Sequence, residues 1–221
     1  MHQSGSTCTF VIGLNDYTAM ILLPTLLGIL QGEAPSVRLK TRHLTLQQRK
    51  VALEDGSVDM VIGSPQEFGA NIYQRLLFND RNICLVSTTH PTIGDTLSLE
   101  QYISSEFIKL SLSDLEEDPI DSELKEKGLV RQIMVTVEHE VLIPQLVAAT
   151  NYIANMGELI SRELIEGLPV KILPIPLKNT DCPAFQFWHA RNQLDPAHRW
   201  FRKIVLKVAG EIGNQTNITA R

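Results

Sequence analysis

The sequence predicts an α/β protein made of two Rossmann-like lobes. Runs of β-branched and aromatic residues alternate with segments whose apolar residues follow helical spacing, which is typical of strands connected by helices. A turn-rich connector at residues 90–95 interrupts this alternation, and a second series of about the same size follows it. A chain of 221 residues with 43% apolar residues is long enough for one large domain or two small ones.

The first series reads β-α-β-α-β, so its strands are expected to be parallel and joined by right-handed crossovers. We expect strands at residues 9–14, 37–41 and 58–63, helices at 20–30 and 46–53, and two further strands at 72–80 and 83–87.

The second series continues the alternation to residue 173. We expect helices at 99–103, 120–127, 141–149 and 159–166, strands at 107–110, 132–137, 152–154 and 170–173, a late strand at 185–189 and a closing amphipathic helix at 196–208. This order predicts lobe I from residues 9–87 plus 188–209 and lobe II from 88–187, with two crossover segments between them. Residues 1–8 and 210–221 are expected to be flexible ends.

Composition excludes several classes of function. With 20 lysines and arginines against 25 aspartates and glutamates, the net charge is −5. This argues against this chain itself binding the phosphate backbone of a nucleic acid. The longest apolar run, residues 19–30, contains Pro24 and Gly28 and is shorter than the ~20 residues that a bilayer requires. No secretory leader is recognisable, so we expect a cytoplasmic protein or a piece of a longer one.

The usual catalytic and cofactor motifs are missing. There is no phosphate-binding glycine loop, no GxSxG, and no pair of histidines or cysteines at metal-ligand spacing. The acidic cluster at residues 115–118 is more typical of a solvated turn than of acid/base catalysis. We therefore expect no cofactor, no metal and no catalytic residues.

The chain does place polar residues where strands end, which is where open α/β sheets bind ligands. Two facing lobes would hold such a ligand in the cleft between them. For each residue, helix capping or turn chemistry is the alternative explanation. The candidate binding residues are Asn15, Asp16, Tyr17, Thr18, Ser64, Pro65, Ser111, Ser113, His139, Thr150 and Asn155.

Several sequence segments, in the same order along the chain, resemble one known family. Residues 10–17, 22–27 and 33–39 look like the start of the effector-binding domain of LysR-type transcriptional regulators, and 53–63 resembles that family's next phrase. Further similar phrases are Leu76-Leu77-Phe78, His90-Pro91, and Trp188-His189 with residues 195–200, the last resembling the branch of nodulation and nitroaromatic or salicylate sensors. The resemblance covers residues 9–208.

The resemblance implies a fold like that of type 2 periplasmic binding proteins, with an aromatic inducer in the interlobe cleft. It carries the effector role onto Asn15, Asp16, Ser64, Ser113 and His139. It also implies a homodimer, with a tetramer of the full-length protein left open, and DNA binding only through an N-terminal winged helix-turn-helix that this chain lacks. Glu138 and Glu140 flank His139 and argue against an anionic inducer, because like charges repel.

Two other readings share the predicted fold. A solute-binding protein of a transport system would have the same lobes and cleft, but the missing export signal opposes it. A cytosolic α/β enzyme is the weaker alternative, because no nucleophile with a base and no metal set emerges from the sequence.

Overall fold

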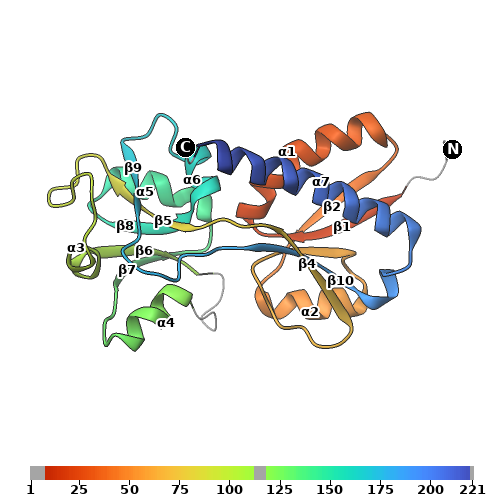
Figure 1. The fold of residues 1–221 in the computed structure, drawn as a ribbon, viewed down its shortest axis with the longest axis horizontal. Coiled ribbons are helices and arrows are strands. Elements are labelled where there is room, and N and C mark those ends of the chain that lie inside the picture. Colours follow the sequence, from red (N-terminus) through yellow and green to blue (C-terminus); the bar gives the residue numbers. More distant parts are fainter. Residues whose placement is uncertain (1–7, 112–117, 220–221) are drawn as a thin grey trace. The chain divides into compact units, whose positions relative to one another are not determined.

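A computed structural model describes residues 8–111 and 118–219, and the side chains up to Ile212 (Figure 1). The chain forms two compact units. Unit 1 contains the chain up to Asn79 and again from Pro183, and unit 2 contains Asp80–Cys182. The chain therefore passes twice between the units.

Unit 1 contains a five-stranded sheet in the order β2-β1-β3-β10-β4. Strand β1 (Thr9–Leu14) pairs in parallel with β2 (Arg38–His43) and with β3 (Met60–Gly63), as the β-α-β-α-β order predicts. The late strand β10 (Ala184–His189) is antiparallel to both β3 and β4 (Ile72–Phe78). The sheet is therefore mixed, with a parallel half and an antiparallel half.

Helices cover both faces of this sheet. Alternate residues of a strand face opposite sides. Phe10 stacks on Phe201 of α7 (Pro196–Thr219), with 4.2 Å between ring centroids, and α7 also contacts α1 (Asp16–Glu33). The next residue, Val11, packs on the cluster formed with α2 (Leu46–Asp55). Thus α1 and α7 lie on one face and α2 on the other (Figure 1).

Unit 2 contains a second five-stranded sheet, in the order β7-β6-β8-β5-β9. Strand β6 (Glu106–Leu110) is parallel to β7 (Gln132–Val137) and β8 (Ile153–Gly157). Strand β5 (Asn82–Ser87) is antiparallel to β8 and β9 (Val170–Pro174). The helical segments are α3 (Leu99–Ser104), α4 (Pro119–Glu126), η1 (Glu140–Leu142), α5 (Ile143–Ala149) and α6 (Glu158–Leu164); in unit 1, a further short turn, η2 (Ala190–Asn192), follows β10.

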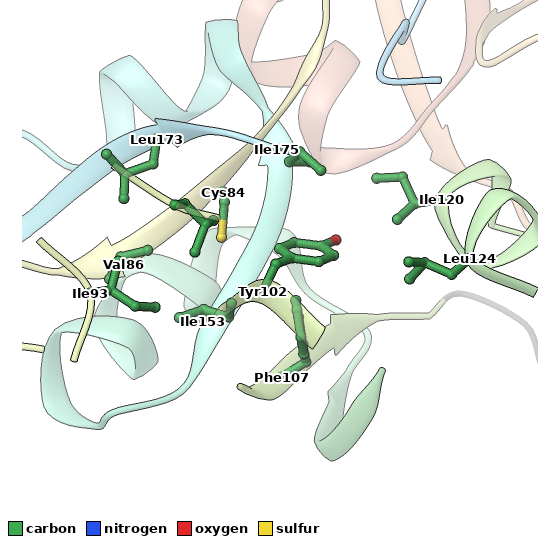
Figure 2. Close-up of a cluster of buried hydrophobic side chains, with 11 residues drawn as sticks. Cys84, Val86, Ile93, Tyr102, Phe107, Ile120, Leu124, Ile153, Leu173 and Ile175 are labelled. Atoms are coloured by element: carbon green, nitrogen blue, oxygen red, sulfur yellow. The ribbon is translucent and has the colours of Figure 1, made fainter. Parts of the chain in front are cut away.

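An apolar cluster fills the space beside this second sheet (Figure 2). Tyr102 and Phe107 are fully buried there and meet edge to face, with 5.0 Å between ring centroids. Cys84 lies in the same cluster, and burial raises its pKa well above the usual range of a thiol. A thiolate is therefore disfavoured at neutral pH, and Cys84 acts as a small apolar side chain.

The expected order of strands and helices is confirmed, but the division into units differs from the sequence prediction. Strand β5 was assigned to lobe I, yet its residues pair with β8 and β9 of unit 2. Strand β10 was assigned largely to lobe II, yet it pairs with β3 and β4 of unit 1. Pairing partners distant in the sequence decide both cases, so the boundaries lie at 79/80 and 182/183 rather than at 87/88 and 187/188.

The closing helix also differs from the prediction. It was expected to end at Val208, but α7 continues to Thr219, so most of the expected flexible C-terminal end is helical. Residues 1–7 lie outside the described part of the chain. Across the described residues, no helix combines the length and the hydropathy needed to cross a bilayer.

A buried arginine ties α4 to β7 in unit 2. The Arg131 side chain is 3% exposed; it donates from Nε to Asp121 Oδ1 (2.7 Å) and from Nη2 to Asp118 Oδ2 (2.5 Å), and its guanidinium lies over the Phe107 ring. Asp118 also caps α4 by accepting from the Ile120 N–H (2.9 Å). One cation therefore anchors the first turn of α4 to the core.

Replacing Arg131 should destabilise unit 2. We expect Arg131→Met to lower the free energy of unfolding by about 2 kcal/mol, less than the ~3–5 kcal/mol of a fully buried pair, because Asp118 and Asp121 stay 25% and 35% exposed. Urea unfolding followed by circular dichroism measures the change. The control Lys125→Met alters an exposed cation of the same helix, and an equal loss there would contradict the anchoring role.

A buried histidine should make the stability of unit 1 depend on pH. His198 is 3% exposed, Arg202 Nη1 donates to its Nδ1 (2.7 Å), and its Nε2 meets the Asp59 backbone oxygen (2.8 Å). Arginine only donates, so Nδ1 must accept and the ring is neutral. Burial, reinforced by Arg202, lowers the pKa of His198 despite the raising effect of the Asp59 hydrogen bond.

The unfolded chain therefore binds a proton at His198 at higher pH than the folded chain does. The free energy of unfolding should fall as pH decreases below about 6.5, the usual histidine pKa, and be unaffected by this group above about 7. His198→Gln should flatten that part of the curve, measured from urea midpoints between pH 5 and 8. An unchanged slope in the variant would rule this out.

Candidate functional site

The carboxyl ends of β1 and β3 bring six of the sequence-predicted residues to one edge of the unit 1 sheet. Gly13 is registered with Val61, so the residues after Leu14 and those after Gly63 leave the sheet on the same side. Strand β2 ends there too, because Leu14 is registered with His43. This edge carries Asn15, Asp16, Tyr17 and Thr18 from the start of α1, and Ser64 and Pro65 after β3.

Two of these residues are engaged in capping α1. Asn15 Oδ1 accepts from the Thr18 backbone N–H (3.0 Å) and hydroxyl (2.7 Å), and Thr18 Oγ1 accepts from the Asn15 N–H (3.2 Å). Thr18 is 1% exposed, and Tyr17 is buried with its ring beside Phe78. Thr18 and Tyr17 thus position the turn, while Asn15 and Asp16 stay partly exposed at the edge.

Two titratable groups meet at this edge. Asp16 Oδ1 lies 4.0 Å from His43 Nδ1, and both side chains are partly exposed. The contact becomes an ion pair only when His43 is protonated. The edge can therefore offer a carboxylate and an imidazole to a ligand's hydroxyl groups.

Arg49 is a candidate site residue that the sequence analysis missed. Arg49 lies on α2 and the whole residue is only 3% exposed. Its Nη1 donates to Ser64 Oγ (3.4 Å). Its guanidinium lies directly against Gly63, since a Cβ there would be 2.9–3.0 Å from three guanidinium atoms. A single arginine among the polar residues of an amphipathic helix gives little signal in the sequence, because most such residues face solvent.

The second sheet gathers a smaller set at its own edge. Strands β6 and β7 are parallel and end together, and the Ser111 N–H donates to the Val137 oxygen (3.0 Å). His139 follows β7, is exposed, and makes no side-chain cap for η1. Ser113, which was predicted alongside them, lies outside the described residues.

Asn155 lies in the middle of β8, the strand next to β6. Its Nδ2 donates to the Tyr102 hydroxyl (2.7 Å), so the amide is held from within the core (Figure 2 shows Tyr102). Its Oδ1 is buried and has no hydrogen-bond partner in the part of the chain that the structure describes. Because an unsatisfied buried acceptor is costly, Asn155 is the residue of unit 2 with most to gain from a ligand's donor.

Thr150 does not join this set. Its hydroxyl donates to the Leu146 oxygen (2.8 Å) and accepts from the Tyr152 N–H (3.2 Å), which is the turn chemistry given above as the alternative. It also precedes β8, whereas Ser111 follows β6, and these strands are parallel. Thr150 therefore lies at the opposite edge of the sheet.

Within the described residues, no group of three histidine, cysteine or acidic side chains could hold a metal ion. What the two sheets present is a set of hydrogen-bonding groups at strand ends and, with Asn155, within β8. Asn15, Ser64 and Asn155 are each oriented by a cap or by a second side chain. Such an arrangement recognises small polar molecules, which places the protein in the class of two-unit α/β binding domains.

The sequence assigns this binding domain to one family. Residues 3–210 match the family described as the LysR substrate binding domain, and the chain belongs to that family. It is 26% identical over 206 residues to the HTH-type transcriptional activator NagR of Ralstonia sp, covering 93% of this chain and 68% of NagR. It is also 26% identical to Nodulation protein D 1 of Sinorhizobium fredii (strain NBRC 101917 / NGR234), covering 96% of this chain and 66% of the relative.

Solved structures share the fold. The effector binding domain of QuiR, solved in complex with shikimate, superposes with a TM-score of 0.76 at 20% identity, covering 93% of this chain and 99% of that one. The chain spans about two thirds of the length of the curated relatives named above. The resemblance to LysR-type regulators, and to the branch of aromatic and nodulation sensors, is thereby confirmed.

The contact between Gly63 and Arg49 can be tested by a double-mutant cycle. Gly63→Ala should push the guanidinium away from Ser64 and lower the free energy of unfolding by about 1 kcal/mol, the low end for overpacking, because a side-chain end can swing aside. In an Arg49→Met background the same alanine should cost clearly less. Urea unfolding of the four proteins gives the coupling, and additive effects would show that the two residues do not interact.

Proposed function

We propose that this chain is the effector-binding domain of a LysR-type transcriptional regulator. One observation carries the proposal: polar residues after β1 and β3 converge at one sheet edge, with the buried Arg49 guanidinium placed beneath Ser64. The family match and the shikimate complex of QuiR support a small-molecule ligand. A helix-turn-helix outside this chain would then read DNA, in line with the activator and regulator names of the relatives.

The ligand's contacts are proposed separately for each unit. In unit 1, Asn15, Asp16 and Ser64 offer both donors and acceptors. In unit 2, Ser111, His139 and Asn155 do the same, and the unsatisfied Asn155 oxygen calls for a donor. Either set suits a small effector, aromatic as in this branch, that carries hydroxyl groups.

The charge at the unit 2 edge is lower than the sequence suggests. Glu140 is buried, so it makes no open negative surface, whereas Glu138 is exposed. One exposed carboxylate beside His139 disfavours an anionic group at that point but does not oppose one near Arg49. An acidic group on an effector is therefore more compatible with the unit 1 edge than with the unit 2 edge.

The proposed mechanism is a shift of population. An effector that binds one arrangement of the domain better than another stabilises that arrangement by the difference in binding free energy. The DNA-reading part responds to this shift without any bond being made or broken, so we propose no catalytic activity. The protein would act in the cytoplasm, where its DNA is.

We further propose that the domain works as a homodimer. On α1, Leu26 and Leu30 are buried in their own unit, but Met20 and Leu27 are 37% and 50% exposed. These two apolar side chains are available for a second copy. A monomer by light scattering at tens of micromolar would contradict the dimer.

The proposed effector site is tested by thermal unfolding with a panel of hydroxylated aromatic acids, neutral aromatics, amino acids and sugars. A ligand at a hundredfold excess over its Kd should stabilise the folded state by about 2.7 kcal/mol. Ser64→Ala and His139→Ala should each weaken the binding about fivefold, in line with the loss of one hydrogen bond.

The control for this panel is Ser104→Ala, which removes an exposed hydroxyl from α3. It should bind the effector as tightly as the original chain. If both site variants bind a stabilising ligand unchanged, the strand ends are not the site. A transport function would instead be favoured if sugars or amino acids stabilise the domain and no aromatic molecule does.

A further inference from the structure

Unit 1 contains a cavity that is separate from the strand-end residues. It has a volume of about 230 Å³ and lies between the α7 face of the sheet and α7 itself. Arg75 on β4 and Gln186 and Trp188 on β10 line the sheet side. Pockets for drug-sized ligands span ~300–1,000 Å³, so this cavity suits a smaller molecule.

Positive charge dominates the wall of this cavity. Arg199, Arg202 and Lys203 line it from α7, where residues three and four apart share one helix face, and no acidic residue lines it. In the part of the chain described by the structure, the side chains of Arg75, Arg199 and Lys203 have no hydrogen bond or ion pair. Like charges gathered on one wall repel one another, and an anion between them would reduce this cost.

Arg202 differs from the other three cations because its donors are in use. It donates to the Asn192 and Gln193 backbone oxygens and to His198, and its guanidinium lies 4.4 Å from the centroid of the Trp188 ring. Burial and then the charge of Arg199 lower its pKa, while Asp195 opposes them. Arg202 is thus a fixed wall of the cavity, and the movable charges are Arg75, Arg199 and Lys203.

The sheet side of the cavity holds a polar group with no partner. Gln186 is only 1% exposed, and its buried Oε1 accepts no hydrogen bond from any residue that the structure describes. Its strand neighbours Phe185 and Phe187 face the α2 side, so Gln186 faces α7. The last torsion of glutamine is soft, so the amide oxygen can turn towards a ligand in the cavity.

We propose that this cavity binds a small anion that also carries a hydroxyl group. The anionic end would lie among Arg75, Arg199 and Lys203, and the hydroxyl would donate to Gln186 Oε1. Hydrogen phosphate, a small phosphate ester and a small hydroxycarboxylate share this chemistry. Sulfate and simple carboxylates have the charge without the donor.

This site is independent of the effector site proposed above. Its lining residues belong to the interiors of β4 and β10, to the segment after η2 and to α7, and none of them is a strand-end candidate. If one of the two proposed sites failed its test, the argument for the other would be unaffected. A regulator with both could respond to an effector and to a common cellular anion.

The test is isothermal titration calorimetry of the chain in Tris buffer at pH 7.5 and constant ionic strength, with two matched pairs of probes. Hydrogen phosphate is compared with sulfate, and lactate with propionate, because each pair differs in the hydroxyl donor. We expect the hydroxyl-bearing member of at least one pair to bind tenfold or more tightly than its partner. The pair that shows the larger preference identifies the ligand as phosphate or carboxylate.

Variants then assign the binding to this cavity. Lys203→Gln and Arg199→Gln, both exposed and safe for folding, should raise the Kd of the preferred probe three- to tenfold. Gln186→Met should remove the preference within the pair, and a thermal melt checks that this buried variant folds. The control Lys207→Gln changes an exposed cation one turn along α7 that pairs with Glu33 instead of lining the cavity.

Three results would overturn the proposal. The first is no binding of any probe at 10 mM. The second is equal binding within both pairs, which would leave a plain electrostatic attraction. The third is a Lys207→Gln effect as large as that of Lys203→Gln, which would place the anion elsewhere on the helix.

Discussion

The parallel pairing of β1 with β3 is the constraint on which the candidate site depends. Parallel neighbours must be joined by a crossover, and here α1, β2 and α2 make that connection. The pairing places the turn before α1 and the turn after β3 at one edge, so Asn15 and Ser64 lie at the same edge although they are 49 positions apart in the sequence. The helix between them then brings Arg49 under the same edge. Without this register between β1 and β3, the polar residues after the two strands would not share one edge of the sheet.

Buried polar groups mark the places where each unit does more than pack. Arg131 and His198 have their donors and acceptors satisfied, and they hold α4 and α7 against their sheets. Asn155 and Gln186 each keep a buried oxygen without a partner among the described residues. A folded protein rarely tolerates such groups without compensation, because desolvation costs about 1–3 kcal/mol each. The satisfied groups therefore contribute to stability, and the unsatisfied oxygens of Asn155 and Gln186 support the two proposed binding sites.

The chain passes from unit 1 into unit 2 and back, and this connectivity is compatible with a domain that responds to a ligand. Unit 1 is completed only when β10 returns from unit 2 and pairs with β3 and β4. The two units are therefore joined by two covalent connections, and each has its own sheet and its own apolar cluster. Rigid units with few connections are the common structural basis for ligand-dependent changes of state.

The sequence by itself determined the order of elements, the parallel start of unit 1 and the positions of Asn15, Ser64 and His139 at strand ends, because periodicity and capping are local signals. The resemblance to the LysR family was also a local signal, because short sequence segments carried it. Only the tertiary structure decided that β5 belongs with β8 and β9, that Thr150 lies at the opposite edge from Ser111, that Arg49 meets Ser64, and that Gln186 lines a cavity. Those outcomes depend on which distant strands pair and on which face a helix buries, and a single sequence carries no direct record of either.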